Sequence, residues 1–113
     1  MSDATIDAAT FAELQESAGA DFVKELVQTF LEEAPAMLSE LREALAAGQA
    51  DVFRRAAHSL KSNSLTFGAL ALAALAREQE LGGLDAARKP DALDALAAEY
   101  ARVARALEAL CRG

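Results

Sequence analysis

The chain contains one histidine, His58, and its neighbours can be inferred from helical spacing. Side chains three and four positions apart share one face of an α-helix. On a helix, the neighbours of His58 are therefore Arg54, Arg55, Lys61 and Ser62. The apolar residues of the same segment fall on a different face. We expect the imidazole to stand at the edge of the core, with one ring nitrogen facing water.

A histidine in this position could act as a nucleophile, because a neutral imidazole has a free lone pair near neutral pH. Phosphorylation would add negative charge and three acceptor oxygens. Lys61, one turn along, and Arg54 or Arg55, one turn back, could offset that charge. The competing interpretation is that a lone histidine usually lies at a helix surface or boundary, and that flanking charges usually form a solvated face. The spacing alone leaves both interpretations open.

The composition disfavours several other functions. The chain has 11 Lys and Arg against 18 Asp and Glu, a formal net charge of −7, which disfavours nucleic acids and anionic membranes as partners. Protein partners are favoured instead. One histidine and one cysteine do not suffice for the usual catalytic zinc sites, so no metal is expected on this chain. No glycine-rich phosphate-binding loop occurs in the sequence, which disfavours a nucleotide-binding enzyme.

The sequence also predicts where the protein acts. Cys111 is the single cysteine and cannot form an internal disulfide, and the opening MSDATIDAAT lacks the basic-then-apolar order of a secretory signal. The longest uncharged, mostly apolar stretch, 62–76, is shorter than the roughly 20 residues of a membrane-spanning helix. We therefore expect a cytoplasmic protein, with Cys111 at the edge of a helix seam and without a redox role.

The elements that must position His58 are predicted to be helices. The chain is rich in Ala, Leu, Glu and Arg, and most of its two Pro and six Gly lie between segments of helical period. The expected helices span 7–19, 21–48, 51–68, 69–83 and 90–110. Asp7 is expected to cap the first helix. Pro35 should kink or locally break the second helix without dividing it, and Pro90 fits the first turn of the last.

Apolar stripes and short connections predict the architecture. The stripe of the second helix consists of Val23, Leu26, Phe30, Met37, Leu41 and Leu45. The seam of the last helix consists of Leu93, Leu96, Tyr100, Val103, Leu107 and Leu110. Long helices with short connections favour an all-α, antiparallel up-down-up-down four-helix bundle with a short additional N-terminal helix across one end. Residues 1–113 then form a single domain, with residues 1–6 expected to be mobile.

The segment around His58 resembles a known family. Residues 57–69, AHSLKSNSLTFGA, look like the signature of histidine phosphotransfer (HPt) domains, approximately A-H-x-L-K-G-[SA]-[SA]-x-x-x-G. Residues 30–45 are similar to the second helix of the family, including its proline, and residues 72–81 to the helix after the active histidine. The resemblance covers the chain from about Asp7 to Leu110. Its histidine, lysine and glycine spacing makes it fairly specific.

The resemblance implies a role for each matching residue. His58 would accept a phosphoryl group from the receiver-domain aspartate of a hybrid histidine kinase and pass it to the receiver domain of a response regulator. Lys61 would contribute positive charge beside the phosphohistidine. Gly68 would let the next helix approach closely, although a simple helix break also explains it. Glu80 would orient one imidazole nitrogen by a hydrogen bond, although an ordinary exposed glutamate is the alternative.

Ser62 departs from the family pattern, in which glycine is the commoner residue one position after the lysine. The serine could narrow the approach to His58, or its hydroxyl could donate a hydrogen bond to the phosphate. In the resembling systems the receiver domain supplies Mg²⁺ and most of the catalytic groups. We therefore expect no cofactor on this chain.

A receiver domain is expected to dock around His58 on the exposed face of the second and third helices. Arg54 and Arg55 lie there, and Leu65, with whichever of Phe22 and Leu26 is exposed, could form an apolar collar. Burial in the core is the preferred interpretation for these three apolar residues. The chain is expected to be a monomer.

Other functions fit the sequence less well. An autokinase is disfavoured because Ser59 follows His58, where dimerising kinase helices usually carry an acid. The main alternative is a non-catalytic HPt-like helical interaction module that docks receiver domains or other proteins. The intact His58 and Lys61 argue against it, because a degenerate relative would be free to lose them. An acidic adaptor without phosphate chemistry leaves the His-Lys-Gly spacing unexplained. The sequence therefore favours a phosphorelay intermediate.

Overall fold

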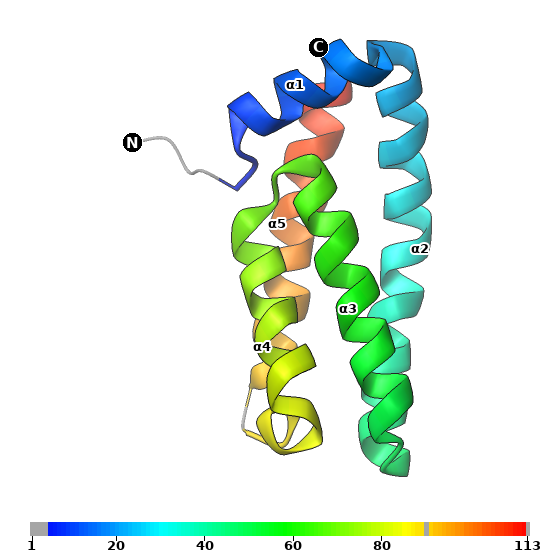
Figure 1. Cartoon of the computed structure of the whole chain (residues 1–113), viewed down its shortest axis with the longest axis vertical. Helices are drawn as coiled ribbons and strands as arrows, with labels where there is room; N and C mark the ends of the chain where they lie inside the picture. Colours follow the sequence, from blue (N-terminus) through cyan, green and yellow to red (C-terminus); the bar gives the residue numbers. More distant parts are fainter. Residues whose placement is uncertain (1–4, 90, 113) are drawn as a thin grey trace.

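Five helices make up the described part of the chain, residues 5–89 and 91–112 of a computed structural model. They are α1 (Ala8–Ala18), α2 (Ala20–Ala47), α3 (Ala50–Phe67), α4 (Leu70–Ala87) and α5 (Ala92–Arg112). In Figure 1, α2 to α5 lie side by side in alternating directions, and α1 crosses one end. The predicted all-α four-helix bundle with an additional N-terminal helix is confirmed. None of the described helices is long and apolar enough to cross a membrane.

The start of α1 is fixed by Asp7, as the sequence predicts. The Asp7 carboxylate accepts hydrogen bonds from the Thr10 backbone N–H at 3.0 Å and from the Thr10 hydroxyl at 2.6 Å. These hydrogen bonds hold the pKa of the Asp7 carboxyl below its usual range. Just before the cap, Thr5 is buried and Ile6 packs against the core. The predicted mobility of residues 1–6 is untested for residues 1–4, which lie outside the described residues.

The long helix α2 stays continuous through Pro35, as predicted, and of the predicted kink or local break the break does not occur. Its first residue is Ala20 rather than Asp21, which lies in the first turn. The helix ends at Gly48, whose φ of 69° and ψ of 28° are left-handed. Glycine adopts this conformation without the steric cost that a Cβ atom would add. The start and end of α2 thus match the prediction to within one residue.

The helix ends near α3 and α4 differ slightly from the prediction. Helix α3 starts at Ala50, one residue before the predicted start, and Asp51 lies in its first turn. In α4, Gly83 has a non-helical φ of 63° and ψ of −152°, which is the stop expected at this glycine pair, and helical residues continue beyond it to Ala87. The expected place of Pro90 in the first turn of the last helix lies outside the described residues.

The core sits between the four long helices. Its largest fully buried residues are Phe53, Leu41, Leu60, Leu72, Leu96, Leu107, Val23, Val103 and Ser64. The predicted seam of α5 is wrong at its last position, because Leu110 is exposed. Cys111, four residues after the buried Leu107, packs against the core instead and is half-buried. Burial raises the pKa of the Cys111 thiol.

Gly68 permits a close approach of the start of α1 to the end of α3. Its carbonyl accepts a hydrogen bond from Asp7 N at 2.8 Å. A Cβ atom on Gly68 would lie 3.0 Å from both Asp7 O and Thr10 Cβ. The tight contact shown at Gly68 is with the start of α1, and the prediction that this glycine also brings the next helix close stays a prediction. Gly68 also ends α3 in the left-handed conformation, with a φ of 80°.

Gly68→Ala should destabilise the fold more than Gly48→Ala. Both glycines have a positive φ, which costs an L-residue roughly 1–2 kcal/mol. A Cβ on Gly48 meets nothing within 4 Å, whereas one on Gly68 would collide with the start of α1. We expect losses of about 1–2 kcal/mol for Gly48→Ala and about 2–4 kcal/mol for Gly68→Ala in urea unfolding. Equal losses would contradict the proposed packing of α1 against Gly68.

Candidate functional site

His58 lies in the middle of α3, on the face that turns away from the core. Its side chain is 56% exposed, whereas the neighbouring Ala57 and Leu60 are fully buried. The change from exposed to buried across adjacent positions follows from the helical period. The buried residues on either side of His58 fix the backbone of α3, and the helix therefore holds the imidazole at the surface.

Glu80 reaches His58 from the neighbouring helix α4. Its Oε2 lies 2.8 Å from His58 Nδ1, and its Oε1 lies 2.8 Å from Lys61 Nζ. Only 14% of the Glu80 side chain is exposed, so the carboxylate is held in place between the two helices. His58, Lys61 and Glu80 together form what we call the His-Lys-Glu cluster. Two of its members, His58 and Lys61, are one turn apart on α3, and the third comes from α4.

The two basic partners keep the Glu80 carboxylate ionised. The hydrogen bond from Lys61, followed by that from His58, holds the pKa of Glu80 below its usual range, although partial burial acts in the opposite direction. An ionised carboxylate only accepts hydrogen bonds, so the Nδ1 atom of His58 must carry the proton. A neutral ring then has its lone pair on Nε2. Nε2 has no partner among the described residues and is free to react.

The pKa of Glu80 should depend on both partners, and most strongly on Lys61. We expect Lys61→Met to raise the Glu80 pKa more than His58→Gln does, because the Lys61 hydrogen bond is the larger cause of the shift. Side-chain carboxyl NMR titration of the wild type and the two variants measures this directly. A Glu80 pKa that is unchanged in Lys61→Met would contradict the ion pair.

The same shift predicts how stability depends on pH. Since the Glu80 pKa is lower in the folded than in the unfolded chain, the ion pair stabilises the fold fully above the unfolded-state pKa. This stabilisation is lost as the pH falls through the folded-state pKa. Replacing Glu80 with Gln removes the titrating group, so the loss of stability on acidification should be smaller in Glu80→Gln than in the wild type.

The other residues that the sequence placed beside His58 do not join the cluster. Arg54 is exposed and has no hydrogen-bonding or ion-pair partner among the described residues. Arg55 donates a hydrogen bond to the Asp51 carbonyl at 3.4 Å. Ser62 is exposed, and its backbone carbonyl accepts a hydrogen bond from the Thr66 hydroxyl at 3.1 Å. Among the described residues, none of these three side chains makes a hydrogen bond or ion pair with the His58 ring.

The preferred core interpretation is wrong for two of the three apolar residues proposed as a collar. Leu65 and Phe22 are exposed, because each falls on the outer side of its helix, while Leu26 is half-buried against the core. Two exposed apolar residues of α4, Leu70 and Leu81, were not singled out from the sequence. Their spacing of eleven residues, three helical turns, is the signal that places both on one face.

Known proteins resemble this chain over most of its length. The family model described as Hpt domain matches residues 25–112. The crystal structure of histidine-containing phosphotransfer protein B (HptB) from Pseudomonas aeruginosa PAO1 superposes with a TM-score of 0.88. The similarity covers 98% of this chain and 97% of that one, with 30% sequence identity. No curated protein sequence matches this chain. From the family match and the structural similarity together, the chain belongs to the Hpt domain family of histidine phosphotransfer proteins.

Proposed function

We propose that this phosphotransfer protein carries its phosphoryl group on Nε2 of His58. The observation that carries the proposal is the His58 to Glu80 hydrogen bond, which occupies Nδ1 and leaves Nε2 free on an exposed ring. The group would come from a phospho-aspartate in the receiver domain of a hybrid histidine kinase. It would then pass to the aspartate of a response-regulator receiver domain. The alternative, a non-catalytic interaction module, does not explain why Glu80 contacts both His58 and Lys61.

The proposed step needs few groups on this chain. The Nε2 lone pair forms a bond to phosphorus, while the bond between phosphorus and the aspartate oxygen breaks and the aspartate leaves as a carboxylate. The ring keeps its Nδ1 proton and becomes positively charged, and the Glu80 carboxylate at 2.8 Å stabilises that charge. Lys61, one turn after His58 and paired with Glu80, contributes positive charge toward the phosphoryl oxygens. When the phosphoryl group passes to a second receiver, the bond between Nε2 and phosphorus breaks, a bond from phosphorus to the new aspartate forms, and the ring becomes neutral again.

The remaining groups belong to the partner. Phosphoryl transfer depends mainly on positioning and charge stabilisation, and we propose that the receiver domain holds the Mg²⁺ while this chain holds no cofactor. The chain would act as a monomeric intermediate in the cytoplasm, without autokinase activity and without nucleic acid or membrane as a partner. Ser62, exposed four residues after His58, would face the incoming phosphoryl group in place of the usual glycine.

Chemical phosphorylation tests this proposal without a partner protein. The wild type is incubated with phosphoramidate, and its intact mass is measured before and after treatment with base and with acid. We expect one phosphoryl group that survives base, is lost in acid and maps to the peptide containing His58. An acid-stable adduct, or no adduct on folded protein, would contradict the proposal and favour the interaction module.

A further inference from the structure

Three hydroxyl side chains follow His58 at alternate positions of α3, and one of them has no hydrogen-bond partner. The Ser64 hydroxyl donates to the Leu60 carbonyl at 2.7 Å, and the Thr66 hydroxyl donates to the Ser62 carbonyl at 3.1 Å. Hydroxyls inside a helix commonly bond the carbonyl four residues earlier in this way. The Ser62 hydroxyl differs, since it makes no hydrogen bond among the described residues. The fold therefore leaves an exposed hydroxyl free to donate at this position.

Ser62 lies on the same face of α3 as His58. Residues four positions apart are separated by about 40° around a helix axis, and their Cβ atoms lie about 5–6 Å apart. The Cα–Cβ bonds of a helix tilt toward its N-terminus, so the Ser62 side chain leans toward the turn that carries His58. Both side chains are exposed, which leaves room between them for a phosphoryl group. A phosphoryl group on the imidazole is therefore within reach of the Ser62 hydroxyl.

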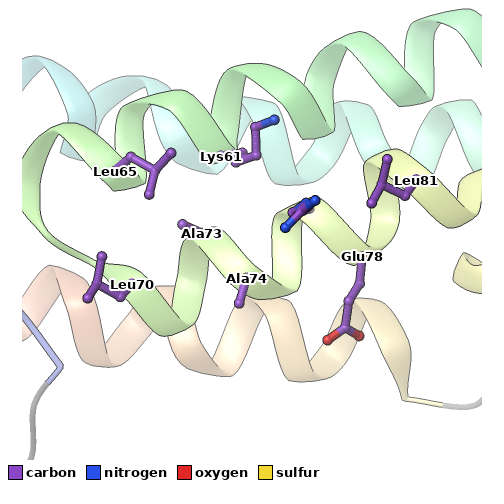
Figure 2. A pocket seen from close by; sticks show the side chains of 8 residues that line it. Lys61, Leu65, Leu70, Ala73, Ala74, Glu78 and Leu81 are labelled. Atoms are coloured by element: carbon purple, nitrogen blue, oxygen red, sulfur yellow. The ribbon is translucent and has the colours of Figure 1, made fainter.

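Lys61 and Ser62 lie on opposite sides of His58. Lys61 is three positions after His58, about 60° around the helix axis in the other direction, which turns it toward α4. Figure 2 shows Lys61 and Leu65 along the edge of α3 that borders α4. Glu80 of α4 binds Nδ1 of His58 from that same side at 2.8 Å. A group bound to Nε2 then extends away from α4, on the side of α3 where Ser62 lies.

The other donors near His58 are less well placed than Ser62. Lys61 Nζ lies 2.8 Å from Glu80 Oε1, so its charge is already partly neutralised. Arg54 has no partner among the described residues, but it precedes His58 by four positions and its Cα–Cβ bond tilts away from the histidine. A hydrogen bond from Ser62 to a phosphoryl oxygen therefore breaks no contact that the side chain makes in the unphosphorylated protein.

We propose that the Ser62 hydroxyl binds the phosphoryl group of phosphorylated His58 by donating a hydrogen bond to one of its oxygens. The proposal rests on the function proposed above, which places the phosphoryl group on Nε2. A hydrogen bond from a hydroxyl to a charged oxygen is short and stronger than one between neutral groups. Because this hydrogen bond exists only in the phosphorylated protein, it stabilises that state. It thus shifts the transfer equilibrium with a receiver domain toward phosphorylated His58.

Phosphorus NMR on the protein phosphorylated with phosphoramidate tests this hydrogen bond. The pKa of the phosphoryl group is obtained from its phosphorus chemical shift as a function of pH. A donor on a phosphoryl oxygen favours the dianion and lowers this pKa. In Ser62→Ala we expect a higher phosphoryl pKa, with the acid dissociation constant reduced about three- to tenfold. The control Ser59→Ala removes another exposed, unpartnered hydroxyl, about 100° around the helix from His58, and should keep the wild-type value.

The charged groups on the helices around His58 are the same in all these proteins, so a difference between the variants does not come from them. They are Glu40 of α2, Arg54, Arg55 and Lys61 of α3, and Arg77 and Glu80 of α4.

Ser62→Gly separates the hydroxyl from the size of the side chain, because alanine removes only the oxygen and glycine also removes Cβ. We expect the same phosphoryl pKa in Ser62→Gly as in Ser62→Ala. A wild-type pKa in both variants, with faster phosphorylation of Ser62→Gly alone, would show that the serine only narrows the approach to His58 and would overturn the proposal. An equal pKa shift in Ser59→Ala would also overturn it. A wild type that phosphoramidate does not phosphorylate would instead overturn the proposed function itself.

Discussion

His58→Gln is expected to abolish transfer from a phosphorylated receiver domain while leaving the fold intact. The only imidazole of the chain is lost, and glutamine has no nitrogen lone pair able to attack phosphorus. Because the His58 side chain is 56% exposed, the substitution should change the free energy of unfolding by no more than about 1 kcal/mol. The measurement is the phosphoryl content of each protein after mixing with labelled phospho-receiver.

The control for this loss is Ser59→Ala, an exposed position next to His58 on α3. It should accept the phosphoryl group like the wild type, because its side chain makes no hydrogen bond among the described residues. Transfer that persists in His58→Gln, or that disappears equally in Ser59→Ala, would show that the reactive group is elsewhere.

Glu80→Gln should produce the second-largest effect on activity. The amide keeps the size of the side chain but removes the anion that fixes the Nδ1 proton and stabilises the positive phosphorylated ring. It also leaves Lys61 without its ion-pair partner. Hydrogen bonds to charged groups are strong enough to give a change of about ten- to a hundredfold in rate. We expect His58 phosphorylation by phosphoramidate to slow by that factor.

A purely structural role of Glu80 would give a different result. Glu16→Gln makes the same charge change at an exposed position on α1 and should leave the rate at the wild-type value. Glu80→Gln should also alter the pH dependence of phosphorylation, since the ring no longer has a carboxylate beside Nδ1. An unchanged rate and pH profile in a folded Glu80→Gln protein would contradict the positioning role.

Much of the fold follows from local signals in the sequence. The Asp7 cap, the glycine stop at Gly48 and the glycine pair that interrupts α4 each act within a few residues, so their positions could be read along the chain. The effect of Gly68 could not, because its close neighbour Asp7 is 61 positions away in the sequence. The prediction that Leu110 is buried is wrong because it rested on residue type and spacing along α5. These do not show that Cys111, rather than Leu110, turns toward the core.

Only the part of the site that lies within one helix could be predicted from the spacing of residues. His58 and Lys61 are one helical turn apart, so helical spacing already places them together. Glu80 comes from another helix, 22 residues later, and only the resemblance to a family indicated it. The groove between α3 and α4, lined by Leu65, Leu70 and Leu81 among others, depends on which faces of two packed helices remain uncovered. The Ala- and Leu-rich sequence of α4 gives little indication of this.

His58 is expected to carry the phosphoryl group on Nε2. Long-range nitrogen, proton and phosphorus NMR on the uniformly nitrogen-labelled, phosphorylated protein identifies which ring nitrogen bears the phosphorus. We predict a single phosphohistidine with phosphorus on Nε2 and a proton on Nδ1, hydrogen-bonded to Glu80. Phosphorus on Nδ1, or phosphorylated protein in which the His58 ring is unmodified, would contradict it.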